Sequence, residues 1–321
     1  MAKSSPGGGL ATLTLNPALD LQTAVDLVEP ENKLRCDEPR QDAGGGGVNV
    51  ARVIGRLGGR ATAVLPLGGP AGQALQARLS AERLDFRVAP IAGDTRQSFT
   101  VLDRSRGAEF RFVLPGPRLT LREFSAIENV LEGLDPEPDI LVVSGSLPPG
   151  VSPERLARMA GRLRRRGVKV AVDASGSGLK AGLEAGVWLV KPNLKEFREC
   201  VGASLADRGS QLAAARELVA AGRSEWMALS LGRDGALMVG KGYAAFAPGL
   251  PITPVSTVGA GDSFMAGLVW ELSRGRRPGD ALATAVAAAS ATLLSPGSGM
   301  ARRADIRRLR PQVQVEILPS G

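Results

Sequence analysis

Short apolar runs recur along the chain, and each ends at a polar or small residue. The clearest cover residues 139–144, 168–173, 187–191 and 226–230. The segments around 152–166, 176–185 and 208–222 lie between them and are predicted to be helices. Short buried strands that alternate with helices are typical of a mostly parallel sheet covered on both faces. We therefore predict an α/β fold with a doubly wound, Rossmann-like sheet flanked by helices.

The carboxyl ends of these predicted strands are where a site is expected, because ligands of open α/β sheets collect there. The ends carry polar and small residues: Ser144 to Ser146, Asp173, Lys191 to Asn193, and Ser230 to Gly232. Upstream, residues 11–16 alternate as a strand does, and residues 48–57 follow a run of four glycines and read as a helix.

Two segments do not fit the alternation of strands and helices, namely residues 21–40 and 95–113. The second alternates apolar and polar residues on both sides of residues 104–107, which predicts a hairpin. We interpret both segments as a small β-sheet lid over the edge of the main sheet. Exposed strands need covering, so we expect a homodimer that pairs through the lid. Residues 1–10 are predicted to be a flexible tail and 11–321 a single domain.

Composition excludes several kinds of chemistry. The chain has no histidine, which removes Ser-His-Asp triads and histidine-ligated zinc, and its two cysteines, Cys36 and Cys200, cannot form a disulfide framework. The net charge is +8, but the arginines are scattered and there is a single tyrosine, so we expect no nucleic-acid partner. No stretch has the length of a membrane span or of a secretion signal, and we expect a cytoplasmic protein with an anionic small-molecule substrate.

The most informative motif covers residues 256–267 and leads from a loop into a long apolar segment, which predicts a helix N-terminus. Gly259, Ala260 and Gly261 allow backbone amides to converge on an anion, and Asp262 lies beside them in the first turn. A proton acceptor next to an anion hole is what phosphoryl transfer to an alcohol requires. From the residues alone, Asp262 is equally well explained as a carboxylate that complements the helix dipole.

A second motif, residues 42–52, places Gly44, Gly45, Gly46 and Gly47 before a helix that carries Asn49. Bare backbone lets a ligand approach closely, and the Asn49 carboxamide can donate to and accept from sugar hydroxyls. The alternative is a flexible linker. The spacing does not match a Walker A loop, which needs Gly-Lys-Ser or Gly-Lys-Thr.

A third motif places Asn193 and Glu196 three residues apart after a strand end, with Lys191 and Lys195 beside them. The pair suits a hydrated magnesium ion that bridges phosphates. A plain capping box at the start of a helix explains the same two residues.

A fourth motif, residues 230–236, follows a strand and turns back into an apolar run. Its backbone amides suit nucleotide phosphates, and an ordinary hairpin turn looks the same.

The four motifs occur together and in order, and with them the chain resembles the ribokinase-like carbohydrate kinases, specifically the phosphofructokinase B group. The resemblance extends from Thr12 to about Arg308, and residues 12–20 and 143–150 also carry it. It implies a ribokinase-like kinase that uses ATP and Mg²⁺, with Asp262 as general base beside the amides of residues 259–261.

The resemblance also implies roles for further residues. The sugar would be held by Asp20, Gly44, Gly45, Gly46, Asn49 and Ser146, and the phosphate that the acceptor already carries by Lys33, Arg35 and Arg96. Nucleotide and magnesium would be handled by Lys191, Asn193, Lys195, Glu196 (through water), Ser230, Gly232 and Gly235. A K⁺ site is implied near Ser256, Val258 and Gly297, and some members bind a second, inhibitory MgATP near the residue that matches Lys195.

The acceptor is predicted from one position, residue 46, at which this chain differs from other members of the group. Members that act on fructose 1-phosphate, and several tagatose 6-phosphate kinases, resemble Gly-Lys-Gly where this chain has Gly46 between glycines. Residues 33–36 and 111–116 also resemble the members that act on fructose 6-phosphate. We therefore expect transfer from MgATP to the 1-hydroxyl of fructose 6-phosphate, with 1-phosphofructokinase or tagatose-6-phosphate kinase activity as the alternative.

Two other classes fit less well. A non-catalytic sugar-phosphate sensor could keep the fold, but Asp262 and its neighbouring glycines are intact. A nucleoside kinase of the same superfamily would favour apolar contacts where the predicted lid offers cations.

Overall fold

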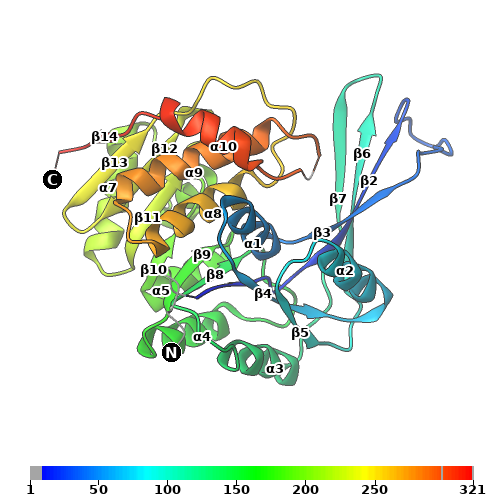
Figure 1. The fold of residues 1–321 in the computed structure, drawn as a ribbon, viewed down its shortest axis with the longest axis horizontal. Coiled ribbons are helices and arrows are strands. Elements are labelled where there is room, and N and C mark those ends of the chain that lie inside the picture. The colour runs from blue at the N-terminus through cyan, green and yellow to red at the C-terminus, as the bar shows by residue number, and fades with distance from the viewer. Residues whose placement is uncertain (1–8, 298, 320–321) are drawn as a thin grey trace.

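The computed structural model describes residues 9–297 and 299–319. Most of the predicted N-terminal tail, residues 1–8, lies outside the described part, whereas Leu10 already begins the first strand. Within the described residues a ten-stranded main sheet has the order β14-β13-β12-β11-β10-β9-β8-β1-β4-β5 (Figure 1). The parallel strands are β1 (Leu10–Leu13), β4 (Thr62–Leu67), β5 (Phe86–Pro90), β8 (Ile140–Ser144), β9 (Lys169–Asp173), β10 (Val187–Val190) and β11 (Ser224–Ser230).

Antiparallel strands extend one edge of this sheet: β12 (Ala236–Gly240), β13 (Tyr243–Ala247) and β14 (Glu316–Ile317). The predicted α/β fold with a mostly parallel sheet is confirmed. The predicted turn at residues 230–236 does form a hairpin between β11 and β12, around a short 3₁₀ helix, Gly232–Asp234.

Helices cover both faces of the main sheet because successive strand residues point to opposite faces. In β8, Ile140 and Val142 join one apolar cluster, and Leu141 and Val143 join the other. The first face is covered by α1 (Gly46–Leu57), α2 (Gly69–Ala81), α8 (Ala260–Ser273), α9 (Pro278–Leu293) and α10 (Arg303–Leu309). The second is covered by α3 (Leu121–Glu132), α4 (Pro153–Arg165), α5 (Ser177–Ala185), α6 (Leu194–Val201) and α7 (Arg208–Ala220).

Helices α8 and α9 lie close together because their shared surface is built from small residues. A Cβ atom on Gly267 would lie 3.0 Å from the carbonyl oxygen of Thr284 and 3.1 Å from the Cα of Ala285. Helix α8 also packs against α1. In Figure 1, α1 lies between the main sheet and the lid. This packing brings the N-termini of α1 and α8 toward the same region.

A separate four-stranded sheet has the order β3-β2-β6-β7, with β2 (Ala18–Val25), β3 (Arg40–Gly44), β6 (Arg96–Asp103) and β7 (Ala108–Val113). It confirms the small β sheet and the hairpin around 104–107. The first expected segment, 21–40, differs from the structure, because strands occupy 18–25 and 40–44 and the residues between them form a loop. Pro30 and Pro39 and several charges interrupt any strand pattern there.

The glycine run also differs from the expected turn. Gly44 ends β3, Gly45 has a φ of 129° and makes the turn, and Gly46 and Gly47 already belong to α1, two residues earlier than predicted. None of the helices in the described part of the chain has the length and hydropathy of a membrane span.

Candidate active site

Polar side chains gather at one edge of the main sheet, where the parallel strands end. Ser144, Asp173 and Ser230 are the last residues of β8, β9 and β11, and Lys191 follows β10. The strands are parallel neighbours, so these ends lie side by side. The polar residues that the sequence places at strand ends therefore do form a cluster in the structure.

Asp262 is the third residue of α8, and the turn before it is built by glycine. Gly259 precedes the helix with a φ of 74°, a left-handed conformation that costs most other residues energy. Its open Cα faces the Met300 side chain, which a Cβ atom would overlap. No side chain of the described residues caps this helix. The Ala260 N–H of the first turn donates to the Thr257 carbonyl over 3.4 Å. Without a side-chain cap, the positive end of the helix dipole can still favour an anion here, and the predicted anion hole stays a prediction.

Asn49 holds the Asp262 carboxylate in place. Its Nδ2 donates to Asp262 Oδ2 over 2.8 Å, which joins α1 to α8 across 213 positions of sequence. Burial raises the pKa of Asp262, although the hydrogen bond from Asn49 and the charges of Lys191 and Arg52 oppose the rise. A carboxylate with a raised pKa is a stronger base, and so a better proton acceptor when ionised.

Ser144 contributes a buried hydroxyl next to this carboxylate. Its Oγ has no partner at hydrogen-bond distance within the described residues, yet the hydroxyl is near enough to lower the pKa of Asp262 slightly. Gly46 lies against it, because a Cβ atom there would overlap Ser144 Oγ. An orphaned buried hydroxyl beside Asp262 is a ready hydrogen-bonding group for a ligand.

Lys191 and Asp173 form a buried ion pair at the same edge. Lys191 Nζ lies 2.9 Å from Asp173 Oδ1, and the two side chains are 5% and 14% exposed. Burial and the charge of Asp262 together raise the pKa of Asp173 to about 6, against the attraction of Lys191. Burial also opposes the charge of Lys191, but the neighbouring carboxylates outweigh it and raise the pKa of the ammonium. The pair therefore keeps a cation beside α8, near Gly261.

Sequence reasoning places Asp173 at a strand end but does not select it as a site residue. Its signal is present, because an acidic residue that closes a buried apolar strand lies at the ligand-binding edge. What the sequence lacks is the register of β9 against β10, which places Asp173 beside Lys191.

Asn193 and Glu196 adopt the capping box that the sequence offers as an alternative. Asn193 Oδ1 accepts from the Glu196 backbone N–H, and Glu196 Oε2 accepts from the Asn193 N–H, each over 2.9 Å. Burial raises the pKa of Glu196, and Lys191 and Asp173 both act on it electrostatically. No group of three metal-ligating carboxylates or thiols is found among the described residues. Magnesium there would need phosphate oxygens and water as its other ligands.

The predicted nucleotide residues lie along the next strand ends. Asn193 and Ser230 pair as an isolated parallel bridge, and the Ser230 N–H donates to the Pro192 carbonyl over 3.0 Å. Gly232 and Gly235 both have positive φ in the turn after β11. Lys195, by contrast, is largely exposed, and its Nζ lies 3.9 Å from Glu199.

The lid sheet carries a further carboxylate, Asp20, and a cation, Arg96. Burial raises the pKa of Asp20 to about 6, and Arg96 opposes the rise. Arg96 is anchored because its Nε donates to the Asn16 carbonyl over 3.2 Å, and Asn16 Nδ2 in turn donates to Ser146 Oγ over 3.0 Å. Gly44 lies directly against Asp20, and a Cβ atom at position 44 would overlap its carboxylate.

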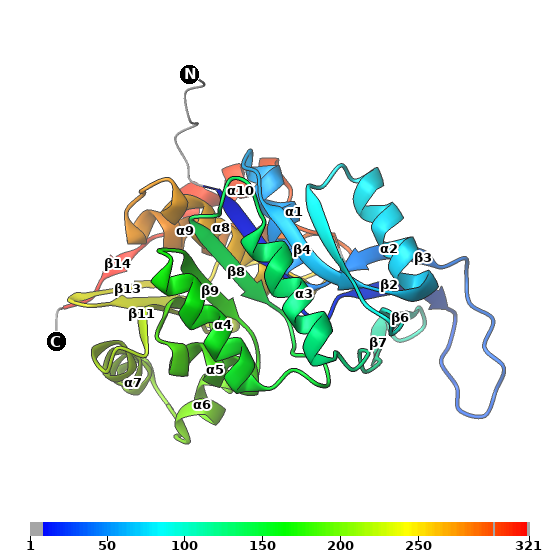
Figure 2. The ribbon, with the colours of Figure 1, turned by 90° about the horizontal axis from the view of Figure 1, so that it is seen from below.

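Lys33 and Arg35 are not brought to this cluster in the single chain. Both are exposed in the loop between β2 and β3, which projects away from the rest of the molecule (Figure 2).

The residues predicted for a K⁺ site lie in two neighbouring loops. The Ser256 hydroxyl accepts from the Val258 N–H, and Val255 and Gly297 line one groove of about 490 Å³ together with lid residues of β2 and β6.

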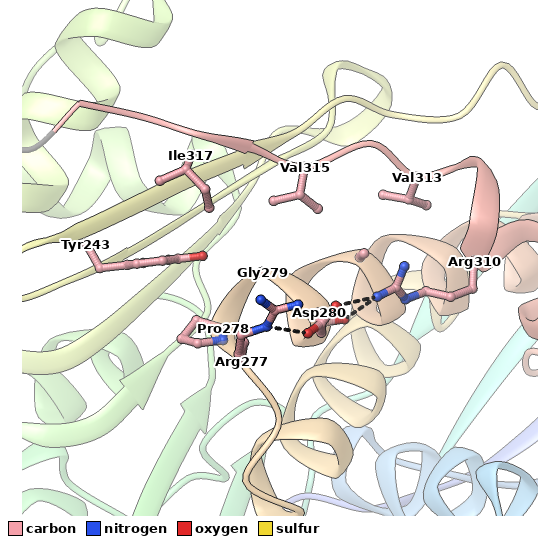
Figure 3. A pocket seen from close by; sticks show the side chains of 10 residues that line it. Tyr243, Arg277, Pro278, Gly279, Asp280, Arg310, Val313, Val315 and Ile317 are labelled. Atoms are coloured by element: carbon pink, nitrogen blue, oxygen red, sulfur yellow. Dashed lines mark hydrogen bonds and ion pairs between the residues drawn. The ribbon is translucent and has the colours of Figure 1, made fainter.

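A second groove, of about 440 Å³, lies away from the strand ends that carry the candidate active site (Figure 3). Tyr243 in it pairs with Gly240, the far end of β12 from Ser230. Arg277 and Arg310 there both pair with Asp280. Because their charges are mutually engaged and the strand ends are far away, this groove is not part of the candidate active site.

Comparisons with known proteins identify the family of the chain. The model of the pfkB family of carbohydrate kinases matches residues 14–304. The ATP-dependent 6-phosphofructokinase isozyme 2 of Mycobacterium tuberculosis is 44% identical over 93% of this chain and 88% of its own length. The isozyme 2 of Escherichia coli is 38% identical over 93% of this chain and 96% of its own.

Solved structures of the Escherichia coli protein share the fold. The crystal structure of its phosphofructokinase-2 in complex with substrates and products has a TM-score of 0.90 and 37% identity, and covers 95% of this chain and 99% of that one. The same protein has also been crystallised in complex with potassium and in a tetrameric inhibited form. The matches of sequence and fold show that this chain belongs to the pfkB family of carbohydrate kinases.

Proposed function

We propose that this chain transfers the γ-phosphoryl group of MgATP to the 1-hydroxyl of fructose 6-phosphate. The observation that carries the proposal is the position of Asp262, which the Asn49 carboxamide holds at the open N-terminus of α8. The proposal is supported by relatives named as ATP-dependent 6-phosphofructokinases that match nearly the whole chain.

In the proposed reaction, Asp262 accepts the proton of the sugar hydroxyl as the oxygen attacks phosphorus. The amides of residues 259–261 and the Lys191 ammonium receive the negative charge of the transferred group. When bound, Mg²⁺ would neutralise charge on the nucleotide phosphates. Asn193 and Glu196 would hold it through water, next to Lys191, whose charge acts on Glu196.

We assign the acceptor to the side of Asp262 that faces the lid. Asp20, Asn49, Ser146 and the backbone of Gly44 to Gly46 would bind sugar hydroxyls, and Arg96 the 6-phosphate, because a guanidinium forms paired bonds with phosphate. At Gly46 the acceptor would meet only backbone and the neighbouring Ser144, with no charged side chain. Lys33 and Arg35 would reach the phosphate only if the β2–β3 loop moves or a second copy of the chain supplies it.

The nucleotide is assigned to the other side, along Lys191, Asn193, Ser230, Gly232 and Gly235. Ser230 and Asn193 already lie next to each other at paired strand ends, and Gly232 and Gly235, which have positive φ, place no side chain over the backbone of the turn. We also propose that a second, inhibitory MgATP binds near Lys195. The exposed ammonium of Lys195 is available to bind its phosphates.

We further propose a K⁺ site at the loops of Ser256, Val258 and Gly297, which the potassium complex of the Escherichia coli relative supports. Equal activity in K⁺ and in Na⁺ would contradict it.

The homodimer through the lid is also proposed, because exposed apolar side chains are concentrated there: Leu34, Phe99, Leu102, Phe112, Val113 and Leu114. A sedimentation mass of one chain would contradict the dimer.

The test of acceptor choice is steady-state ADP production by the purified protein with MgATP. Fructose 6-phosphate, fructose 1-phosphate, tagatose 6-phosphate and unphosphorylated sugars are offered separately, and kcat/KM is compared. We expect a clear preference for fructose 6-phosphate. A preference for another phosphosugar would keep the mechanism and overturn the acceptor, and no turnover with any of them would favour a non-catalytic sensor.

A further inference from the structure

Arg52, one turn after Asn49 on α1, makes a set of hydrogen bonds that the proposed reaction does not explain. Its Nη1 donates to Asn49 Oδ1 over 2.6 Å and its Nη2 to the Ala43 carbonyl over 2.9 Å. Nε and Nη2 also donate to the two carboxylate oxygens of Glu82, over 2.6 and 3.0 Å. The Arg52 side chain is 12% exposed. A guanidinium with this many partners in one plane is held firmly.

The bond from Arg52 decides which way the Asn49 carboxamide points. Arginine has donors and no acceptor, so Asn49 must turn its oxygen toward Arg52. Its Nδ2 is then directed at Asp262, where it donates to Oδ2. The opposite orientation would place the amide oxygen against the carboxylate and the amide N–H groups against the guanidinium. Both contacts would be repulsive.

Arg52 also connects the lid sheet to α8. Ala43, whose carbonyl it binds, belongs to β3 and pairs with Leu19 in β2, one residue before Asp20. Glu82 follows the end of α2 and fixes the far side of the guanidinium. Arg52 therefore contacts both β3, which lies on the acceptor side, and Asn49, which holds the proposed base.

We propose that Arg52, clamped by Glu82, is a positioning residue that sets the orientation of the Asn49 carboxamide and thereby aims the Asp262 carboxylate at the acceptor hydroxyl. This inference rests on the proposed function, because it takes Asp262 to be the base. Arg52 itself does not touch the reacting atoms.

Several charged groups act on the carboxylate whose titration would report this role. Asp262 is influenced by Arg52 from α1 and by Lys191 after β10, and it acts in turn on Asp173 at the end of β9. Arg52 also acts on Asp20 in β2 and on Arg56 in α1. Removing the charge of Arg52 would remove an influence that lowers the pKa of Asp262, so this pKa would rise.

The test compares Arg52→Gln and Arg52→Lys with wild type in kcat, in KM for both substrates and in the pH dependence of kcat. Loss of a residue that orients a metal ligand typically costs about 10- to 100-fold in activity, and we expect a similar scale for a residue that orients the partner of a base. We expect Arg52→Gln to lower kcat by at least about tenfold, with the acidic limb of the profile moved to higher pH and the KM for ATP within about twofold. Arg52→Lys keeps the charge and loses the planar fork, so its kcat should fall while the acidic limb stays close to that of wild type.

Arg78→Ala is the matched control. Arg78 also reaches from a helix to β3, where its Nη2 lies 3.4 Å from Gln41 Oε1, but it has no bond to Asn49. Its kinetic constants should stay within about twofold of wild type. If Arg78→Ala lost as much activity as Arg52→Gln, a general loosening of the lid would explain both results and the proposal would be overturned.

Glu82→Gln decides the matter if Arg52→Gln fails to fold. Glu82 is 35% exposed, so the substitution is mild, and it loosens the clamp while leaving the charge of Arg52. We expect a fall in kcat of at least about threefold without a rise of the acidic limb. Unchanged kcat in Glu82→Gln and in whichever Arg52 variants fold would overturn the proposal. An inactive Asp262→Asn variant alongside that result would leave the proposed base intact, whereas an active one would remove the base itself.

Discussion

Replacing Asp262 by asparagine is expected to lower kcat by about 10²- to 10⁴-fold, because the substitution removes the proton acceptor and keeps the shape of the side chain. The carboxamide oxygen of the substituted side chain can still accept from Asn49, so the start of α8 should remain in place. Turnover is measured by ADP release with saturating fructose 6-phosphate. Nucleotide affinity, measured by calorimetry with a non-hydrolysable ATP analogue, should be nearly that of wild type.

The pH dependence provides a second reading of the same substitution. The pKa of Asp262 is raised by burial, and the base works only when ionised. Wild-type kcat should therefore be highest above this pKa and fall as the pH drops through it. The residual activity of Asp262→Asn should lack that acidic limb. Full turnover in the variant, or an unchanged acidic limb, would mean that another group takes the proton.

Replacing Lys191 by methionine is expected to abolish most turnover and to lower the free energy of unfolding, by about 3–5 kcal/mol when the partner of a buried ion pair is lost. Asp173 would be left buried without its cation. Its pKa is already about 6 and would rise further without Lys191, so protonation would relieve the unfavourable burial as the pH falls. The loss of stability should thus be larger at pH 8 than at pH 5, as measured by urea unfolding.

The double variant Lys191→Met with Asp173→Asn separates stability from catalysis. It leaves no buried charge at the pair, so much of the lost unfolding free energy should return. Turnover should not return, because no ammonium remains beside the first turn of α8. Recovery of turnover together with stability would show that Lys191 acts through folding alone and not on the phosphoryl group.

The sheet edge that forms the site could be predicted because it depends on local patterns. Apolar runs that end at Ser144, Asp173, Lys191 and Ser230 place those residues at one edge once the strands are taken as parallel. The N-terminus of α8 was predictable for a similar reason, since glycines before an apolar helical segment mark a helix start. These features require no knowledge of how distant segments pair.

The remaining features depend on register and on packing between distant segments. The pair of Lys191 with Asp173 requires that β9 and β10 be neighbours in a particular register. The network from Glu82 through Arg52 and Asn49 to Asp262 joins three helices, and nothing in the local sequence of α1 distinguishes Arg52 from a solvated arginine.

The turn at Asn193 and Glu196 shows a different limit. A capping box and a magnesium-binding pair share the same spacing and the same local geometry. The sequence therefore cannot separate the two interpretations, and the capping hydrogen bonds leave the magnesium role as a proposal.

The lid strands differ from their expected bounds for a physical reason as well. Residues 18–20 continue β2 backwards because Ala18 to Asp20 pair on both sides, with β3 and with β6. That pairing could not be read from residues 21–40 alone. Gly44 is expected in a turn, yet it ends β3, because it pairs with Ala18 of β2.

The most direct test of the proposed reaction is to identify the product that forms from MgATP and fructose 6-phosphate. Phosphorus NMR of a reaction with excess acceptor would follow ADP and the new phosphate ester together. We predict one new ester at the 1-position of the sugar for each ADP released. Release of ADP with inorganic phosphate and no ester, or an ester at another carbon, would contradict the proposed function.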